Sequence, residues 1–142
     1  MMKHLLLTGL AVALTATMGY SDQTKTKIVI PVSKTAPTSG RQMYGSYCAP
    51  CHGVDGKGHG TVAFALRTPP TDLTTVAKTN HGVFPDTHIV SVLQFGTSNP
   101  AHRTAEMPAW GPILGKMNQS NPQDRLLRIS NLSRYLETIQ VR

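Results

Sequence analysis

The chain has 142 residues with ordinary apolar content, few aromatic residues and 12 glycines, a length that suits one compact domain rather than two. Its 14 lysines and arginines against 7 acidic residues give a formal charge of +7, but the basic residues are scattered. Without a dense basic cluster and interleaved aromatic residues, we do not expect nucleic acid as a partner. The charge fits either a solvated surface or electrostatic steering toward an acidic partner.

The N-terminal segment has the pattern of an export signal. A short basic start precedes the apolar run Leu5–Leu14, and small and polar residues follow. The run is shorter than the ~20 apolar residues that span a bilayer. We therefore expect residues 1–20 to be a cleavable signal peptide, cut between Ala16 and Asp22. The mature chain would then be periplasmic or otherwise exported, with no integral membrane span.

A polar arm is expected over residues 21–39, which are rich in Thr, Lys, Ser and Pro. Pro31 and Pro37 discourage a helix there. One apolar stretch, Ile28–Val32, is expected to pack on the chain's own domain as a short extended piece; the alternative is that it docks a partner. Residues 40–142 would form the domain itself.

The most informative motif is Cys48-Ala-Pro-Cys51-His52, at the end of an expected short helix over residues 40–47. Each thiol can add to one haem vinyl group, and the imidazole of His52 can reach the iron. Three alternatives are a thioredoxin-like redox pair, half of a zinc site, and chance. No strand leads into Cys48, and no second cysteine pair exists, which disfavours the first two. The sequence therefore predicts one haem c, covalently bound through Cys48 and Cys51.

A glycine-rich loop over residues 53–60 follows the motif. Pro69-Pro70 then fixes an extended turn, after which Thr71 or Asp72 can cap a short helix over residues 73–78.

Two longer helices are expected in the second half of the chain. Pro85 suits the first turn of a helix that ends at Gly96, with an apolar side formed by Ile89, Val92, Leu93 and Phe95. The last helix has Asn121 as N-cap, Pro122 at its first position and Asp124 near the positive end of its dipole. Its apolar positions are Leu126, Ile129, Leu132, Leu136 and Ile139, with Tyr135 beside them. No strand-rich region or repeat appears, so the expected fold is all-α.

A haem held by His52 has its other face closed by a second ligand or left open. The candidates for a second ligand are Met107, Met117, Met43, His59, His81, His88 and His102. Met107 is preferred, because proline and glycine in Met107-Pro-Ala-Trp-Gly111 impose an irregular path that can present one side chain inward. Met43 is too close to the cysteine motif to reach the opposite face, and His59 lies in the loop just after it. A histidine such as His102, or an open site, remains an alternative.

Together these features resemble a class I cytochrome c, and they are similar to small bacterial monohaem domains, including those attached to terminal oxidases. Gly40 and Tyr44 stand where that family has the small and aromatic residues of its first helix, and Leu132 and Tyr135 look like the paired positions of its last helix. The resemblance implies an all-α fold of about three to five helices around one covalently bound haem, with the N- and C-terminal helices crossing.

The resemblance also implies roles for individual residues. Cys48 and Cys51 would form the thioether bonds, His52 would be the proximal iron ligand and Met107 the distal one. The family uses a proline carbonyl to accept the second N–H of the proximal histidine, for which the candidates here are Pro69 and Pro70. Two further side chains, Trp110 and Arg67, are candidates for contact with a haem propionate.

The function implied is one-electron transfer between a donor and an acceptor redox protein, not enzymatic catalysis. Two alternatives stay open. The chain could be the haem c subunit of a membrane oxidoreductase complex, or a gas-binding or peroxidatic haem protein with an open sixth site.

Overall fold

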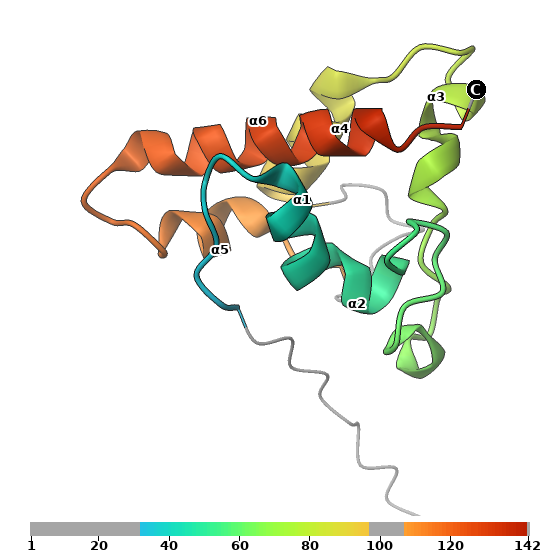
Figure 1. Cartoon of the computed structure of the whole chain (residues 1–142), viewed down its shortest axis with the longest axis horizontal. Coiled ribbons are helices and arrows are strands. Elements are labelled where there is room, and N and C mark those ends of the chain that lie inside the picture. Colours follow the sequence, from blue (N-terminus) through green and yellow to red (C-terminus); the bar gives the residue numbers. More distant parts are fainter. Residues whose placement is uncertain (1–31, 97–106, 142) are drawn as a thin grey trace, which may run out of the picture.

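The computed structural model describes residues 32–96 and 107–141 (Figure 1). The expected signal peptide, most of the stretch Ile28–Val32 and the candidate ligand His102 lie outside these ranges. Within them the chain forms helices and no strand. Over the same ranges, no helix combines the length and apolar character needed to cross a membrane. The α-helices are α1 (Gly40–Met43), α2 (Ala49–His52), α3 (Val76–Thr79), α4 (Asp86–Phe95), α5 (Trp110–Gly115) and α6 (Pro122–Thr138).

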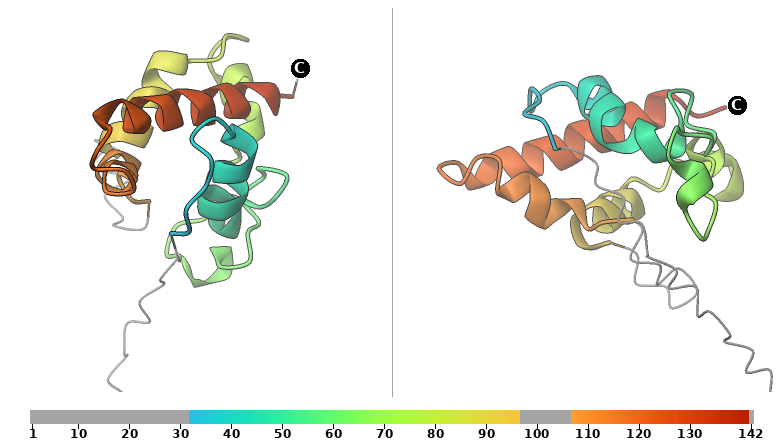
Figure 2. Two further views of the ribbon diagram at one scale, coloured as in Figure 1. Left: turned by 60° about the vertical axis from the view of Figure 1, so that its left-hand side comes forward. Right: turned by 90° about the horizontal axis from the view of Figure 1, so that it is seen from below.

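The longest of these helices, α6, runs across the molecule and contacts α1, α4 and α5 (Figures 1 and 2). Its start is as predicted: the Asn121 side chain accepts the Gln123 N–H at 3.1 Å, and Pro122 occupies the first turn. The buried face includes Ile129, Leu132 and Leu136. Leu126 was expected on this face but is 47% exposed. It lies at the edge of the face, because residues advance about 100° per position in an α-helix.

The first and last helices cross at Gly40, as the resemblance implied. A β-carbon at Gly40 would overlap the Asn131 carbonyl oxygen and lie 2.8 Å from Cβ of Tyr135. The Tyr135 ring packs on the Tyr44 ring with centroids 5.2 Å apart, and Leu132 beside them is fully buried. Absence of a side chain at Gly40 thus permits the close approach, and the aromatic pair fills the adjoining space.

The chain between α1 and α2 is one continuous helical stretch that contains a π-helical turn, Tyr44–Cys48. Ser39 caps its start by accepting the Gln42 N–H at 3.2 Å. Gly53, with φ of 81°, ends it immediately after His52. The expected helix over residues 40–47 is therefore present, with a wider turn where it enters the cysteine motif. Such turns are frequently found at functional sites.

Residues 33–37, which we call the strap, lie in the expected polar arm and pack against the domain. The Tyr47 hydroxyl donates to the Ser33 carbonyl at 2.6 Å, and the Asn131 amide donates to the Pro37 carbonyl at 3.1 Å. Thr35 is buried. This end of the arm is therefore part of the packed structure around α1 and α6.

The segment from residue 72 to residue 96 contains α3 and α4, and α4 packs against α5 and α6. Asp72 caps the 3₁₀ turn Leu73–Thr75, which leads into α3, by accepting the Thr74 N–H at 2.8 Å. In α4, Ile89 and Leu93 are buried, whereas Phe95 is 72% exposed and does not belong to the apolar side as expected. Phe95 is six positions after Ile89, so at about 100° per residue it lies about 240° further round the helix axis and points away from the core.

Candidate functional site

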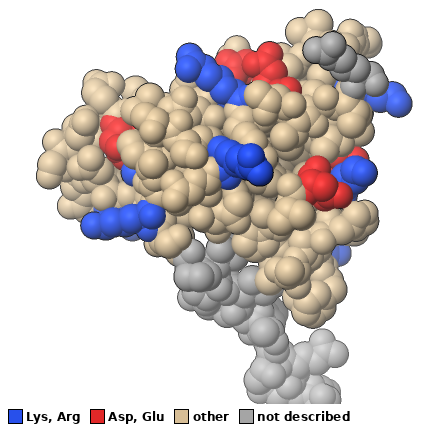
Figure 3. All heavy atoms as spheres, in the orientation of Figure 1, with Lys and Arg blue, Asp and Glu red and all other residues tan. Residues whose placement is uncertain are grey.

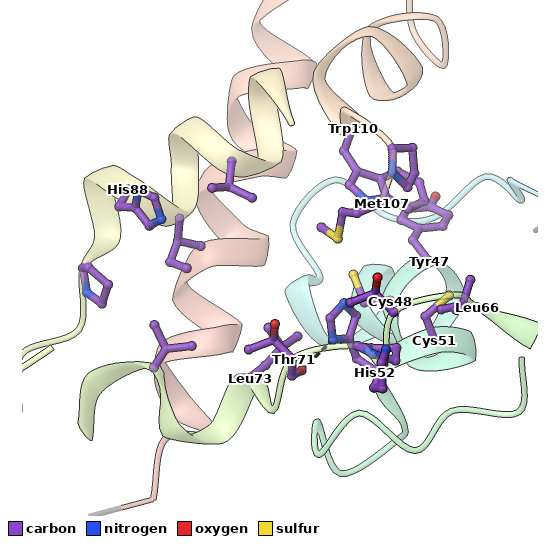
Figure 4. A pocket seen from close by; sticks show the side chains of 18 of the residues that line it. Tyr47, Cys48, Cys51, His52, Leu66, Thr71, Leu73, His88, Met107 and Trp110 are labelled. Atoms are coloured by element: carbon purple, nitrogen blue, oxygen red, sulfur yellow. Dashed lines mark hydrogen bonds between the residues drawn. The ribbon is translucent and has the colours of Figure 1, made fainter. Parts of the chain in front are cut away.

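A cavity of about 570 Å³ lies between α2, the segment from residue 66 to α4, and the stretch that leads into α5 (Figure 4). This is within the range of small-molecule and cofactor sites. Most of its surface is aliphatic or aromatic, from side chains that include Leu66, Leu73, Val76, Ile89, Val92 and Trp110. A large, flat apolar group would therefore find favourable contacts here.

Both cysteines line the cavity from the α2 side (Figure 4). Neither forms a disulfide. Burial raises the pKa of the Cys48 thiol, which is 6% exposed, to about 12, and burial also raises the pKa of Cys51. In the described ranges, no three His, Cys, Asp or Glu residues gather where a metal ion could be held, which disfavours the half-zinc alternative.

His52 is the last residue of α2 and its ring is held in a fixed orientation. Its Nδ1 atom lies 3.0 Å from the Thr71 carbonyl oxygen (Figure 4). A carbonyl can only accept, so Nδ1 carries the proton and Nε2 has a free lone pair. Burial lowers the pKa of His52, while the bond to Thr71 acts in the opposite direction. Histidines that ligate metals do so as neutral imidazoles: one ring nitrogen binds the metal while the other donates its N–H to an acceptor such as a carbonyl.

The acceptor for His52 differs from the sequence-based candidates. Pro69 and Pro70 also line the cavity, but the carbonyl that contacts the ring belongs to Thr71. The signal in the sequence was the proline pair itself, since it fixes the extended path that delivers the next carbonyl to His52. The exact register of that path depends on the length of the preceding loop.

Met107 is half-buried and lines the same cavity. Figure 4 shows its side chain reaching in from the α5 side, whereas His52 enters from the α2 side. Three residues later, Trp110 begins α5 and is almost fully buried. Its ring stacks on Tyr47, with centroids 5.3 Å apart and planes inclined by 26°. The irregular path expected around Met107 therefore ends at an anchored aromatic pair.

The other candidate ligands are less well placed. His88, on α4, lines the cavity and is exposed. His102 lies outside the described residues. The remaining candidates do not line the cavity: Met43, Met117, His59 and His81. Of the two side chains expected near a propionate, Trp110 lines the cavity and Arg67 does not.

A family model described as cytochrome C oxidase, cbb3-type, subunit III matches residues 35–120, more than half of the chain. The chain belongs to this family. No curated protein and no solved structure gives a match. Membership of the cbb3-type subunit III family confirms the expected cytochrome c domain and, with the helices of the described residues, its all-α fold.

The residues that line the cavity of this chain fit the haem c that the cbb3-type subunit III family implies. Two free thiols one turn apart, a neutral imidazole and a thioether face one largely apolar cavity. Thioether attachment uses both cysteines, and iron ligation uses the imidazole. The structure thus brings Cys48, Cys51, His52 and Met107 together, and their individual roles stay predictions.

Proposed function

We propose that the chain transfers single electrons between redox partners outside the cytoplasm, through a haem c bound to Cys48 and Cys51 and ligated by His52 and Met107. The observation that carries this proposal is the shared cavity, which gathers all four side chains from segments far apart in the sequence. When bound, the haem supplies a one-electron couple. The chain supplies burial, orientation and electrostatics.

Each ligand has a distinct task in this proposal. The Thr71 carbonyl holds the His52 ring in one orientation and raises the basicity of Nε2. Methionine sulfur is a soft, weak donor that favours the reduced state and raises the reduction potential. Two side-chain ligands leave no position for a substrate, which separates an electron carrier from a gas-binding or peroxidatic protein. The mainly apolar lining of the cavity would place the haem in surroundings of low polarity.

The family match also supports a second form of this function, as the haem c subunit of a membrane oxidoreductase. Both forms use the same haem site. Figure 3 shows basic side chains spread over one face, with acidic ones among them, rather than gathered in a single basic patch. Co-purification with a large membrane partner would favour the subunit, and recovery in the periplasmic fraction as a single chain would favour the free carrier. N-terminal sequencing of the recovered protein tests the expected cleavage between Ala16 and Asp22.

The ligand assignment is tested by visible spectra of the holoprotein and of Met107→Leu in both oxidation states. We expect a low-spin ferrous spectrum and a ferric methionine–sulfur band in the wild type, with the band lost in Met107→Leu. Met43→Leu is the control, since Met43 is buried but does not line the cavity. A band that survives in Met107→Leu would show that Met107 is not the ligand. Carbon monoxide binding to the ferrous wild type without denaturant would favour the open-site alternative.

A further inference from the structure

A buried arginine of α6 joins this helix to the strap. Arg128 is only 6% exposed, and its Nε donates to the Asp124 carboxylate at 2.5 Å. Its Nη1 donates to the Thr35 carbonyl at 2.9 Å and to the Thr35 hydroxyl at 3.0 Å. Because a guanidinium has donors and no acceptor, the direction of these bonds is fixed. The charge is thus compensated by one carboxylate and by two oxygens of the strap.

The hydrogen bonds continue from Thr35 to Tyr47, and each hydroxyl donates to the next oxygen along the chain. The Thr35 hydroxyl accepts from Arg128, and its oxygen lies 2.7 Å from the Tyr47 hydroxyl. The Tyr47 hydroxyl has two pure acceptors within reach, the Ser33 carbonyl at 2.6 Å and the weaker Met117 sulfur at 3.7 Å, and its proton goes to the carbonyl. The Thr35 proton therefore goes to Tyr47, and each of the two hydroxyls accepts one hydrogen bond and donates one. Buried bonds aligned in this way strengthen one another and hold their groups in place.

Tyr47 is the member of this chain that reaches the haem site. It precedes Cys48 directly, its ring lines the cavity, and the ring stacks on Trp110. Trp110 also lines the cavity and is three residues after Met107. The Tyr47–Trp110 pair thus connects the helix that carries the cysteines with the stretch that carries the distal ligand.

We propose that Thr35 is a positioning residue for the haem site, which acts through the hydroxyl of Tyr47 and the Tyr47–Trp110 stack on Met107. Arg128 fixes the Thr35 hydroxyl, and the hydroxyl and the Ser33 carbonyl fix Tyr47 from two sides. Loosening of the stack frees the Met107 stretch to leave the cavity more often. The inference rests on the proposed function, since it takes Met107 to be the distal ligand.

The test measures how readily the distal ligand is displaced in the ferric holoprotein, by optical titration with imidazole and by loss of the methionine–sulfur band on heating. Thr35→Val removes the hydroxyl and keeps the shape of the side chain. We expect imidazole to bind about fivefold more tightly, as the loss of one net hydrogen bond permits, and the band to disappear at a lower temperature. Thr35→Ser keeps the hydroxyl and should behave as the wild type.

Tyr47→Phe removes the hydroxyl that receives the Thr35 hydrogen bond and keeps the aromatic ring. We expect it to change imidazole binding in the same direction, and it decides the question if Thr35→Val gives no holoprotein. Ile129→Val is the control for general loss of stability, since Ile129 is a buried neighbour of Arg128 in α6 that takes no part in the chain of hydrogen bonds. It should lower the unfolding midpoint and leave imidazole binding unchanged.

The outcomes separate the two proposals. A wild type without the methionine–sulfur band contradicts Met107 as the ligand and overturns both. A wild type with the band, together with Thr35→Val and Tyr47→Phe variants that bind imidazole as the wild type does, overturns only the role of Thr35. Equal tightening in Ile129→Val would also overturn it, because the effect would then follow stability in general.

Discussion

Gly40 in α1 packs against the backbone of Asn131 in α6 so closely that a β-carbon would overlap the Asn131 carbonyl oxygen. Backbone atoms cannot move aside as the end of a flexible side chain can. The crossing of the first and last helices therefore depends on the absence of a side chain at this one position.

Gly40→Ala should destabilise the holoprotein by about 1–3 kcal/mol, the usual cost of forcing an extra carbon into a well-packed contact. Gly45→Ala is the matched control, because Gly45 lies in the same helical stretch and its β-carbon would meet nothing within 4 Å. It should be neutral or stabilising by up to about 1 kcal/mol, since alanine favours helical backbone more than glycine does. Urea denaturation of both variants measures the difference. Equal stability of the two would contradict the close crossing.

The ionised carboxylate of Asp72 should stabilise the protein, and this stabilisation should be lost in acid. Its carboxylate accepts from the Thr74 hydroxyl at 2.6 Å and from the Thr74 N–H at 2.8 Å, and these bonds lower its pKa below the ordinary value of 3.8. The unfolded chain therefore binds this proton more readily than the folded one. The stabilisation that Asp72 provides is fully present above pH 3.8. It is lost as the pH falls through the lower pKa that Asp72 has in the folded protein.

In the wild type, the urea concentration at the unfolding midpoint should fall between neutral pH and a pH well below 3.8. In Asp72→Asn this fall should be smaller. Glu137→Gln makes the same change of charge at an exposed position of α6. If both variants show the same acid dependence, the cap formed by Asp72 is not its source.

Gln140 joins α3 to the end of α6. Its side chain accepts the Ala77 N–H at 2.9 Å and donates to the carbonyls of Leu73 and Leu136, each at 2.7 Å. Gln140→Ala should cost about 1–2 kcal/mol of unfolding free energy, because backbone groups lose their partners. Hydrogen exchange at the Ala77 amide should accelerate as well. Gln123→Ala, at an exposed position in the first turn of α6, should change neither quantity.

Local sequence signals predicted the helix starts and stops well. Asn121 and Pro122 begin α6, Asp72 caps the turn before α3, and Gly96 ends α4 with φ of 78°. In each case the deciding interaction lies within a few residues along the chain, so one sequence contains the whole signal. The same holds for the cysteine motif, whose spacing alone indicates its chemistry.

Features that depend on contacts between distant segments were missed. Thr71, rather than Pro69 or Pro70, supplies the acceptor for His52, and 19 positions separate the two residues. Arg128 and Thr35 are 93 positions apart, and neither residue type at those positions suggests a buried pair. Leu126 and Phe95 were wrongly placed on the buried sides of their helices, since at about 100° per residue Leu126 lies at the edge of the buried face and Phe95 points away from it.

The family match ends at residue 120, whereas the helix that α1, α4 and α5 all contact begins at Pro122. A fragment trimmed to the matched residues would keep every predicted haem-binding side chain and lose Arg128 and the surface that Gly40 abuts. Such a fragment should emerge from expression as a collapsed polypeptide with poor haem retention. The boundaries of the family match are therefore an unsafe guide to where this domain can be truncated.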